Sequence, residues 1–205
     1  MEARRAVTAG PDDPAFWEGR YASADTGWDL GAPSPPFVRL HQDGVIAPCR
    51  VAVPGCGSGW EVAWLARAGY RVTGIDFAPG AIAAAGRRLG ADGVAAELLH
   101  ADLFHLPARL DGAFDLVLEQ TCFCAIAPAR RADYVTAVGR LLRPGGRLVA
   151  LFYACNGDDG PPFTTSPDEV RALFSGVFDI TSLAVTPHSH ARRLGQEWLG
   201  VLTRR

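Results

Sequence analysis

Short apolar runs alternate along the chain with longer stretches in which apolar and polar residues mix. The apolar runs, which predict buried strands, lie at residues 51–53, 71–75, 95–100, 114–119 and 147–153. The mixed stretches between them predict helices at residues 59–69, 79–90 and 128–142. Strands that alternate with helices of this length indicate βαβ units, and therefore a parallel sheet covered by helices on both faces.

The two ends of the chain depart from this alternation. Residues 1–13 are predicted to form a loose tail. The remaining elements are predicted to be a helix at 14–22, an irregular stretch at 25–36, a helix at 167–174 and strands at 177–185 and 195–203. Because no helix separates the last two strands, we expect them to form an antiparallel hairpin at an edge of the sheet.

Composition and charge narrow the class of protein. The 205 residues are 48 % hydrophobic and 20 % charged, which is typical of a globular chain, and we expect residues 1–205 to form a single domain. The formal net charge is −2 and the arginines are scattered, so no nucleic-acid partner is expected. The N-terminus has no apolar signal region, and no run of about 18 apolar residues occurs. We therefore expect a cytoplasmic monomer without a membrane segment.

The counts of lysine and cysteine exclude further kinds of chemistry. All 20 residues in the Lys+Arg count are arginine, which excludes a Schiff-base lysine and the lysine of a phosphate-binding loop. The five cysteines are odd in number, so no disulfide framework is expected. Cys122 and Cys124 are too close together for the usual zinc motif and are interpreted as buried thiols, so no metal is expected.

The most specific local pattern is a glycine loop directly after the first strand. Gly55, Gly57 and Gly59 follow the apolar run at 51–53, and Asp76 stands at the end of the second strand. Glycines permit a tight turn and a close approach of the backbone to a ligand. A carboxylate at the position of Asp76 can accept both hydroxyls of an adenosine ribose. A turn with a purely structural role is the alternative.

Two ligand classes compete for this loop. A dinucleotide fingerprint has a third glycine for close packing of helix on strand, and here Trp60 stands in its place. S-adenosylmethionine brings no pyrophosphate and tolerates a larger residue there. Asp102 and Leu103 follow the third strand, where an adenine amino group would be met, and residues 141–148 form a sharp turn before the fifth strand. Together these features resemble the successive motifs of class I methyltransferases.

Longer pieces of the chain resemble the thiopurine methyltransferase family, with its halide and thiol methyltransferase members. The pieces are Phe16-Trp17-Glu18 with Tyr21, Thr26 to Gly31, Val53 to Gly59, Gly74-Ile75-Asp76, Phe114 to Val117, Phe123 to Pro128, Arg131 with Tyr134, and Gly160 to Phe163. The resemblance implies a seven-stranded, doubly wound, Rossmann-like, mostly parallel α/β sheet with an antiparallel C-terminal strand. It also implies that residues 14–36 close over the cofactor as a lid.

The resemblance further implies the residues of the site. Those matched to the cofactor are Trp17, Tyr21, Trp28, Gly55, Gly57, Asp76, Asp102, Leu103 and Gln120. Tyr21 replaces a residue that is often Trp, and Gln120 stands where the plant halide enzymes have Tyr. Arg131 matches an arginine near the substrate, and the other arginines are expected on the surface and at helix ends. Core packing for Trp17 and Trp28, and a structural ion pair for Arg131, are the alternatives. Glu119 is interpreted as a strand-end carboxylate outside the site.

The resulting hypothesis is methyl transfer from S-adenosylmethionine to a small soft nucleophile, with S-adenosylhomocysteine as the product. The acceptor is expected to be a thiolate, a halide or a thiocyanate-like anion. One alternative is a methyltransferase that acts on oxygen or nitrogen of a larger metabolite. Others are a non-catalytic domain that binds S-adenosylmethionine, and a nicotinamide dehydrogenase. The aromatic residues of the lid fit a sulfonium cation, which gains roughly 0.5–2 kcal/mol from an aromatic face.

Overall fold

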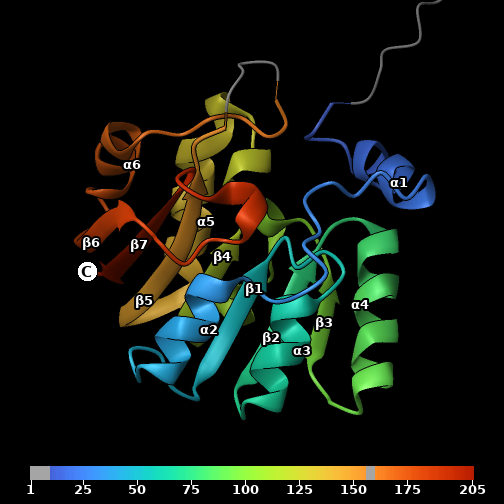
Figure 1. Cartoon of the computed structure of the whole chain (residues 1–205). Helices are drawn as coiled ribbons and strands as arrows, with labels where there is room; N and C mark the ends of the chain where they lie inside the picture. The colour runs from blue at the N-terminus through green and yellow to red at the C-terminus, as the bar shows by residue number, and fades with distance from the viewer. Residues whose placement is uncertain (1–9, 156–159) are drawn as a thin grey trace, which may run out of the picture.

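A seven-stranded sheet forms the centre of the molecule in the computed structural model, which describes residues 10–155 and 160–205. The strands follow the order β3-β2-β1-β4-β5-β7-β6 across the sheet (Figure 1). Their bounds are β1 Arg50–Pro54, β2 Arg71–Asp76, β3 Glu97–His100, β4 Phe114–Gln120, β5 Leu142–Tyr153, β6 Phe178–Val185 and β7 Glu197–Arg204. The helices are α1 Pro14–Ala22, α2 Pro35–Gln42, α3 Trp60–Arg67, α4 Pro79–Asp92, α5 Arg131–Leu141 and α6 Pro167–Phe174.

The direction of the strands confirms the predicted doubly wound topology. Strands β3, β2, β1, β4 and β5 pair in parallel, whereas β7 pairs antiparallel with both β5 and β6. The predicted C-terminal hairpin is therefore present. Strand β7 is inserted between β5 and β6, so that β6 forms the outer edge of the sheet.

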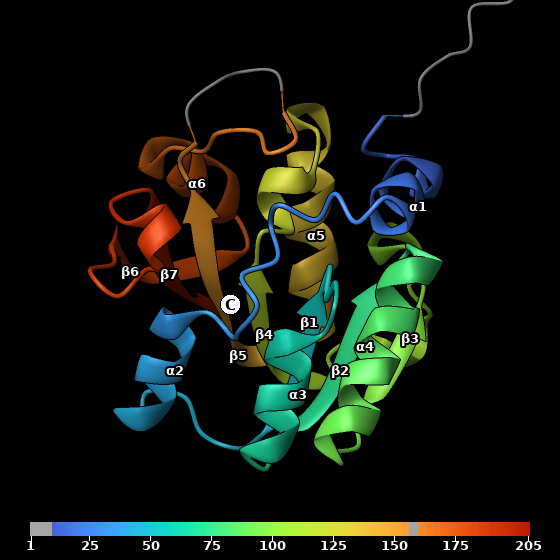
Figure 2. The same cartoon turned by 45° about the vertical axis from the view of Figure 1, so that its right-hand side comes forward.

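Two layers of helices cover the sheet, with α2, α3 and α4 on one face and α5 and α6 on the other (Figure 2). Successive residues of one strand contribute to different cores. Val51 and Val53 pack in the core under α3, whereas Ala52 between them packs in the core that includes Tyr134 and Phe174. Central strands of this kind are buried on both faces. This double burial is why they stand out in the sequence as continuous apolar runs.

Helix α2 corrects the prediction of an irregular stretch at residues 25–36. The helix begins at Pro35, and Pro35 and Pro36 occupy its first positions. Proline is tolerated there because the first N–H groups of a helix have no partner within the helix. Phe37 follows and is fully buried under the sheet. These two prolines are therefore typical of a helix start as well as of a loop.

Two further boundaries differ from the sequence prediction. The helix predicted at 128–142 begins as a 3-10 turn at Pro128–Arg130 and continues as α5. Strand β5 begins at Leu142, earlier than the predicted 147, and its pairing with β4 is irregular near Phe114.

In the described part of the chain, no helix is long and apolar enough to cross a membrane. All five cysteines are free thiols.

Gly59 sets the distance between α3 and α4. It has a φ of +79° and precedes the first residue of α3. A Cβ built on it would lie 2.8 Å from the Cβ of Ala85, which is too close for two carbon atoms. Gly59 thus serves the packing of one helix on another, which differs from the packing of helix on strand that the third glycine of a dinucleotide fingerprint serves.

We expect Gly59→Ala to lower the free energy of unfolding by about 2–4 kcal/mol, because it adds both a left-handed φ and a clash with α4. Urea denaturation followed by circular dichroism measures this change. Gly86→Ala is the matched control, since a Cβ there has its nearest neighbour, Leu98 Cδ1, at 3.8 Å. Equal stability of the two variants would contradict the assignment.

Candidate active site

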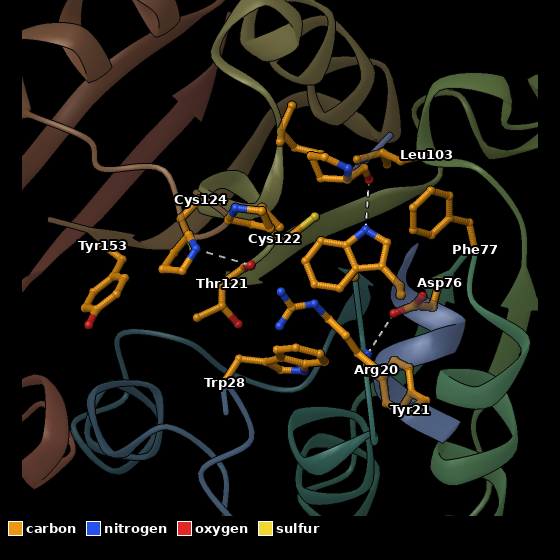
Figure 3. A pocket seen from close by; sticks show the side chains of 18 of the residues that line it. Arg20, Tyr21, Trp28, Asp76, Phe77, Leu103, Thr121, Cys122, Cys124 and Tyr153 are labelled. Atoms are coloured by element: carbon orange, nitrogen blue, oxygen red, sulfur yellow. Dashed lines mark hydrogen bonds between the residues drawn. The ribbon is translucent and has the colours of Figure 1, made fainter. Parts of the chain in front are cut away.

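A cavity of about 370 Å³ opens at the carboxyl ends of the parallel strands. Its wall is formed by the loops after β1, β2, β3 and β4, by the end of β5 and by the N-terminal segment. The order of the strands reverses between β1 and β4, which is where open α/β sheets bind their ligands. Figure 3 shows Asp76, Phe77 and Leu103 toward one end of this cavity and Tyr153 and Cys124 toward the other.

Asp76 is the buried carboxylate of the first end. One oxygen accepts a hydrogen bond from the N–H of Gly57 at 3.0 Å, and the other accepts one from the N–H of Ala78 at 2.9 Å. Burial raises the pKa of Asp76, and these N–H groups counteract that rise by stabilising the ionised form. Each carboxylate oxygen retains a second lone pair. Asp76 thus fits the two hydroxyls of a ribose.

The loop after β3 forms the neighbouring wall. Asp102 accepts hydrogen bonds from the N–H of Phe104 at 2.9 Å and from Nδ1 of His105 at 2.7 Å. Leu103, together with Phe77 after β2, adds apolar surface to the same end of the cavity. Apolar walls beside a fixed carboxylate fit a planar base with an exocyclic amino group.

The glycines of the loop allow other segments to come close. Gly55 and Gly57 both have positive φ, at +57° and +54°. A Cβ on Gly55 would lie 2.9 Å from Cys122 Sγ, and a Cβ on Gly57 would lie 3.1 Å from the hydroxyl of Tyr21. Any larger residue would push away the wall that faces it.

Three aromatic residues of the N-terminal segment line the cavity, as the resemblance implies. The ring of Trp28 meets the ring of Trp17 edge to face at 5.3 Å and that of Tyr21 at 5.8 Å. The indole N–H of Trp17 donates to the carbonyl of Pro11 at 2.8 Å. Burial raises the pKa of Tyr21, so its hydroxyl stays neutral. The faces of aromatic rings suit a cationic ligand.

Hydrogen bonds between side chains and backbone groups fix the N-terminal segment onto the rest of the structure. Glu18 in α1 accepts from the N–H of Gly80 at 2.7 Å and so caps α4 from outside. Arg193 donates to the carbonyl of Trp28 at 2.9 Å, and Arg192 donates to the next carbonyl, that of Asp29, at 2.8 Å. The segment that lines the cavity is thus held by α4 and by the C-terminal hairpin.

Trp60 has a role that its position in the sequence does not reveal. Its indole N–H donates to Asp29 Oδ1 at 2.7 Å, and Ser58 donates to the other oxygen of the same carboxylate. The guanidinium of Arg88 lies 3.1 Å from the centre of the Trp60 ring. Trp60 therefore joins the glycine loop to the N-terminal segment. The sequence alone does not show this contact, because its partner Asp29 lies 31 positions away in the chain.

Two residues matched to the site lie outside the main cavity. Gln120 lines a smaller pocket of about 30 Å³ beside the glycine loop, together with Trp28, Gly55 and Gly57. Arg131 is 1 % exposed and is not part of either wall. It forms an ion pair with Glu169 at 2.5 Å and donates to the carbonyls of Phe163 and Thr164.

The contacts of Arg131 correct its expected role as a substrate-positioning residue. Its guanidinium also lies 4.7 Å from the centre of the Phe123 ring, so its charge is used within the protein core. The carbonyls that it binds follow Pro161 and Pro162, which do line the cavity. Arg131 supports that part of the wall from behind.

The second end of the cavity contains residues that the sequence analysis did not assign to the site. Thr121, Cys122 and Cys124 come from the loop after β4, and Tyr153 ends β5. Arg193 also lines the cavity and is only 6 % exposed, so the expectation of a surface arginine is wrong there.

Arg193 is held in place by a buried carboxylate. Its guanidinium pairs with Glu197 at 3.2 Å and lies 5.3 Å from the centre of the Tyr153 ring. No pattern around Arg192 and Arg193 distinguishes these two arginines from a surface pair, because the partner of Arg193 becomes known only with the fold.

The chain is similar to known methyltransferases over most of its length. The family described as "Thiopurine S-methyltransferase (TPMT)" matches residues 12–198. "Probable thiol methyltransferase 2" of Arabidopsis thaliana and "Thiocyanate methyltransferase 1" of Brassica oleracea are each 31 % identical, over 90 % of this chain and 82 % of the relative. A structure solved in work on the conversion of a disulfide bond into a thioacetal group during echinomycin biosynthesis is 29 % identical, with a TM-score of 0.74. That similarity covers 86 % of this chain and 84 % of the other.

We expect Asp76→Ala to weaken binding of S-adenosylmethionine by roughly 100-fold to 1,000-fold, because two hydroxyls lose a charged acceptor. Isothermal titration calorimetry measures this loss, and a thermal melt checks that the variant is folded. Asp43→Ala, at an exposed carboxylate paired with Arg39, is the control and should bind the cofactor normally. An unchanged dissociation constant in Asp76→Ala would remove Asp76 from the site.

We expect Trp60→Phe to weaken cofactor binding about three- to tenfold, because it keeps a ring for Arg88 but loses the hydrogen bond to Asp29. Calorimetry again provides the measurement. Trp64→Phe, on the same helix and packed edge to face on His41, is the matched control and should have no effect. If both variants bind equally well, the link through Trp60 does not hold the segment in place.

Proposed function

Because this chain belongs to the thiopurine S-methyltransferase family and is an S-adenosylmethionine-dependent methyltransferase, we propose that its acceptor is a small soft nucleophile, namely a thiolate, a halide or a thiocyanate-like anion. The observation that carries the proposal is the second end of the cavity, where Cys122, Cys124 and Tyr153 surround the space beyond the glycine loop. The names of the two plant relatives, which refer to thiol and thiocyanate acceptors, point to the same chemistry.

The size of the cavity supports a small acceptor. Pockets for ligands range from roughly 300 to 1,000 Å³, and this cavity of about 370 Å³ must hold both cofactor and acceptor. A larger metabolite methylated on oxygen or nitrogen, the first alternative from the sequence, would need more space. The dehydrogenase alternative is excluded by the family, and so is the non-catalytic domain.

For the cofactor, we propose the residues that the sequence and the cavity have in common. Asp76 would accept the ribose hydroxyls, and Asp102 and Leu103 would bound the adenine. The backbone at Gly55 and Gly57 leaves room for the rest of the molecule, and Gln120 faces the small pocket beside it. Trp17, Tyr21 and Trp28 would surround the sulfonium as the lid.

When bound, S-adenosylmethionine supplies a methyl group on a positively charged sulfonium and leaves as neutral S-adenosylhomocysteine. The task of the protein is then to place the acceptor in line with that methyl group. Correct positioning of two reactants contributes roughly 7–11 kcal/mol to catalysis. The aromatic segment also keeps water away, which removes the hydration shell that slows an anionic nucleophile.

The thiols of the second end do not compete with the acceptor. Burial raises the pKa of Cys122 and of Cys124, and the nearby carboxyl group of Glu119 raises both further. A thiol in this state is neutral and a poor nucleophile. The two sulfur atoms therefore form a polarizable wall that remains unreactive, beside the ion pair of Arg193 with Glu197.

A panel of acceptors tests the proposal by the rate of S-adenosylhomocysteine formation. The panel contains iodide, bromide, thiocyanate, hydrosulfide, an aromatic thiol, a thiopurine and selenium or tellurium oxyanions, with a catechol and an amine as oxygen and nitrogen controls. We expect kcat/KM for at least one sulfur or halide acceptor to exceed that of both controls by about 100-fold. Turnover of the controls alone would contradict the proposal.

The dependence on pH adds a second criterion. For a thiol acceptor, kcat/KM should rise about tenfold per pH unit below the pKa of that thiol and level off above it, because the thiolate is the nucleophile. Iodide is already ionised and should show no such rise. If kcat/KM for the thiol acceptor does not change with pH around the pKa of that thiol, a base in the protein removes the thiol proton.

A further inference from the structure

Glu119 is a fully buried carboxyl group beside the cavity that the proposed reaction does not use. It lies near the end of β4, with none of its surface exposed, and it is not part of the cavity wall. One oxygen, Oε1, accepts two hydrogen bonds, both of 2.8 Å, from the backbone N–H groups of Cys122 and Phe123. The other oxygen, Oε2, is buried and has no hydrogen-bond partner among the residues that the structure describes. Burial of an unpaired oxygen is costly and calls for an explanation.

The loop held by these two bonds is strained and carries much of the cavity wall. Thr121 has a φ of +58°, a left-handed conformation that non-glycine residues adopt mainly where the surroundings impose it. Five loop residues line the cavity, namely Thr121, Cys122, Cys124, Ala125 and Ile126. Farther along the loop, the carbonyl of Cys124 accepts from the N–H of Phe163 at 2.7 Å, and the buried ring of Phe123 packs on Tyr134 at 5.2 Å. Glu119 is the side chain that binds the backbone at the start of the loop, next to the strained Thr121.

We infer that Glu119 is a positioning residue, which keeps the loop from Thr121 to Ile126 in the conformation that shapes the acceptor end of the cavity. This inference rests on the proposed function, since it takes that end as the place of the acceptor. Glu119 acts through the backbone of Cys122 and Phe123 and does not touch the reactants.

The charges around Glu119 make its hold on the loop dependent on pH. Burial raises the pKa of Glu119 to about 7, against the stabilising effect of the two N–H donors. Glu197 on β7 raises it further, and Arg193 before β7 lowers it. The other titratable groups around it are Tyr134 on α5 and the thiols of Cys122 and Cys124 on the loop itself.

The sign of this dependence follows from the direction of the pKa shift. Opening of the loop admits water to Glu119, which returns the pKa of its carboxyl group toward the ordinary value. Because the closed state raises this pKa to about 7, the protonated carboxyl group favours the closed loop and the ionised carboxylate favours the open one. The loop should therefore be held less firmly as the pH rises from 6 to 8.

Two substitutions separate positioning from general stability. Glu119→Gln keeps a carbonyl oxygen that can accept from both N–H groups, but it cannot ionise, whereas Glu119→Leu removes the acceptor. Glu97→Gln and Glu97→Leu are the controls, because Glu97 is also a strand carboxylate but is exposed and accepts a hydrogen bond from Thr73 in the neighbouring strand. The readouts are the affinity for S-adenosylmethionine, the KM for the best acceptor of the panel, and hydrogen exchange of the peptide spanning residues 119–126.

We expect Glu119→Leu to lose at least tenfold protection from exchange at Cys122 and Phe123 and to raise the acceptor KM at least tenfold, while cofactor affinity stays within about threefold. Glu119→Gln should restore protection and KM to within about threefold of wild type. Protection in the wild type should decrease between pH 6 and 8, and in Glu119→Gln it should stay level. Both Glu97 controls should match the wild type.

Other outcomes overturn the inference. Unchanged exchange and KM in Glu119→Leu would do so, as would a Glu119→Gln variant as impaired as Glu119→Leu. If Glu119→Leu does not fold, Glu119→Gln and the pH profile decide alone. If no acceptor of the panel is methylated, the proposed function fails. The exchange measurement, which needs no acceptor, still tests Glu119.

Discussion

The close approach of separate backbone segments around the loop after β1 is the constraint on which the rest of the structure depends. Gly55 lies against Cys122, Gly57 against Tyr21, and Gly59 against helix α4. Each of the three glycines has a positive φ, so the turn requires glycine for its conformation as well as for its space. The cofactor loop, the acceptor loop and the N-terminal segment meet at this turn. A shift in any one of them displaces the other two.

A buried ion pair in the C-terminal hairpin also holds the N-terminal segment in place. Arg193 pairs with Glu197 inside the C-terminal hairpin and donates to the carbonyl of Trp28 in the N-terminal segment. Buried ion pairs add little stability compared with apolar packing, although the loss of one partner is strongly destabilising. The value of this pair is therefore positional, because a guanidinium can bind a carboxylate and a carbonyl at once.

The sequence analysis correctly predicted the parts of the protein whose structure depends on residues within a single βαβ unit. Both the central strands, which are buried on two faces, and the glycine loop with Asp76 depend on neighbours that are close in the chain. The acceptor end depends on distant partners. Arg131 was expected at the substrate but meets Glu169, whereas Arg193 was expected on the surface but meets Glu197. No local pattern distinguishes a buried arginine from an exposed one before its partner is known.

The partners at the acceptor end also explain why a soft nucleophile suits it better than a hard one. A compact oxyanion that leaves water needs strong hydrogen-bond donors in exchange. Here Cys122 and Cys124 offer only weak S–H donors, and the hydroxyl of Tyr153 donates to Gln196 at 3.1 Å. Arg193 already donates to Glu197 and Trp28. A large anion with diffuse charge loses less hydration and gains more from contact with polarizable sulfur. The sulfur atoms of this wall therefore favour a soft acceptor.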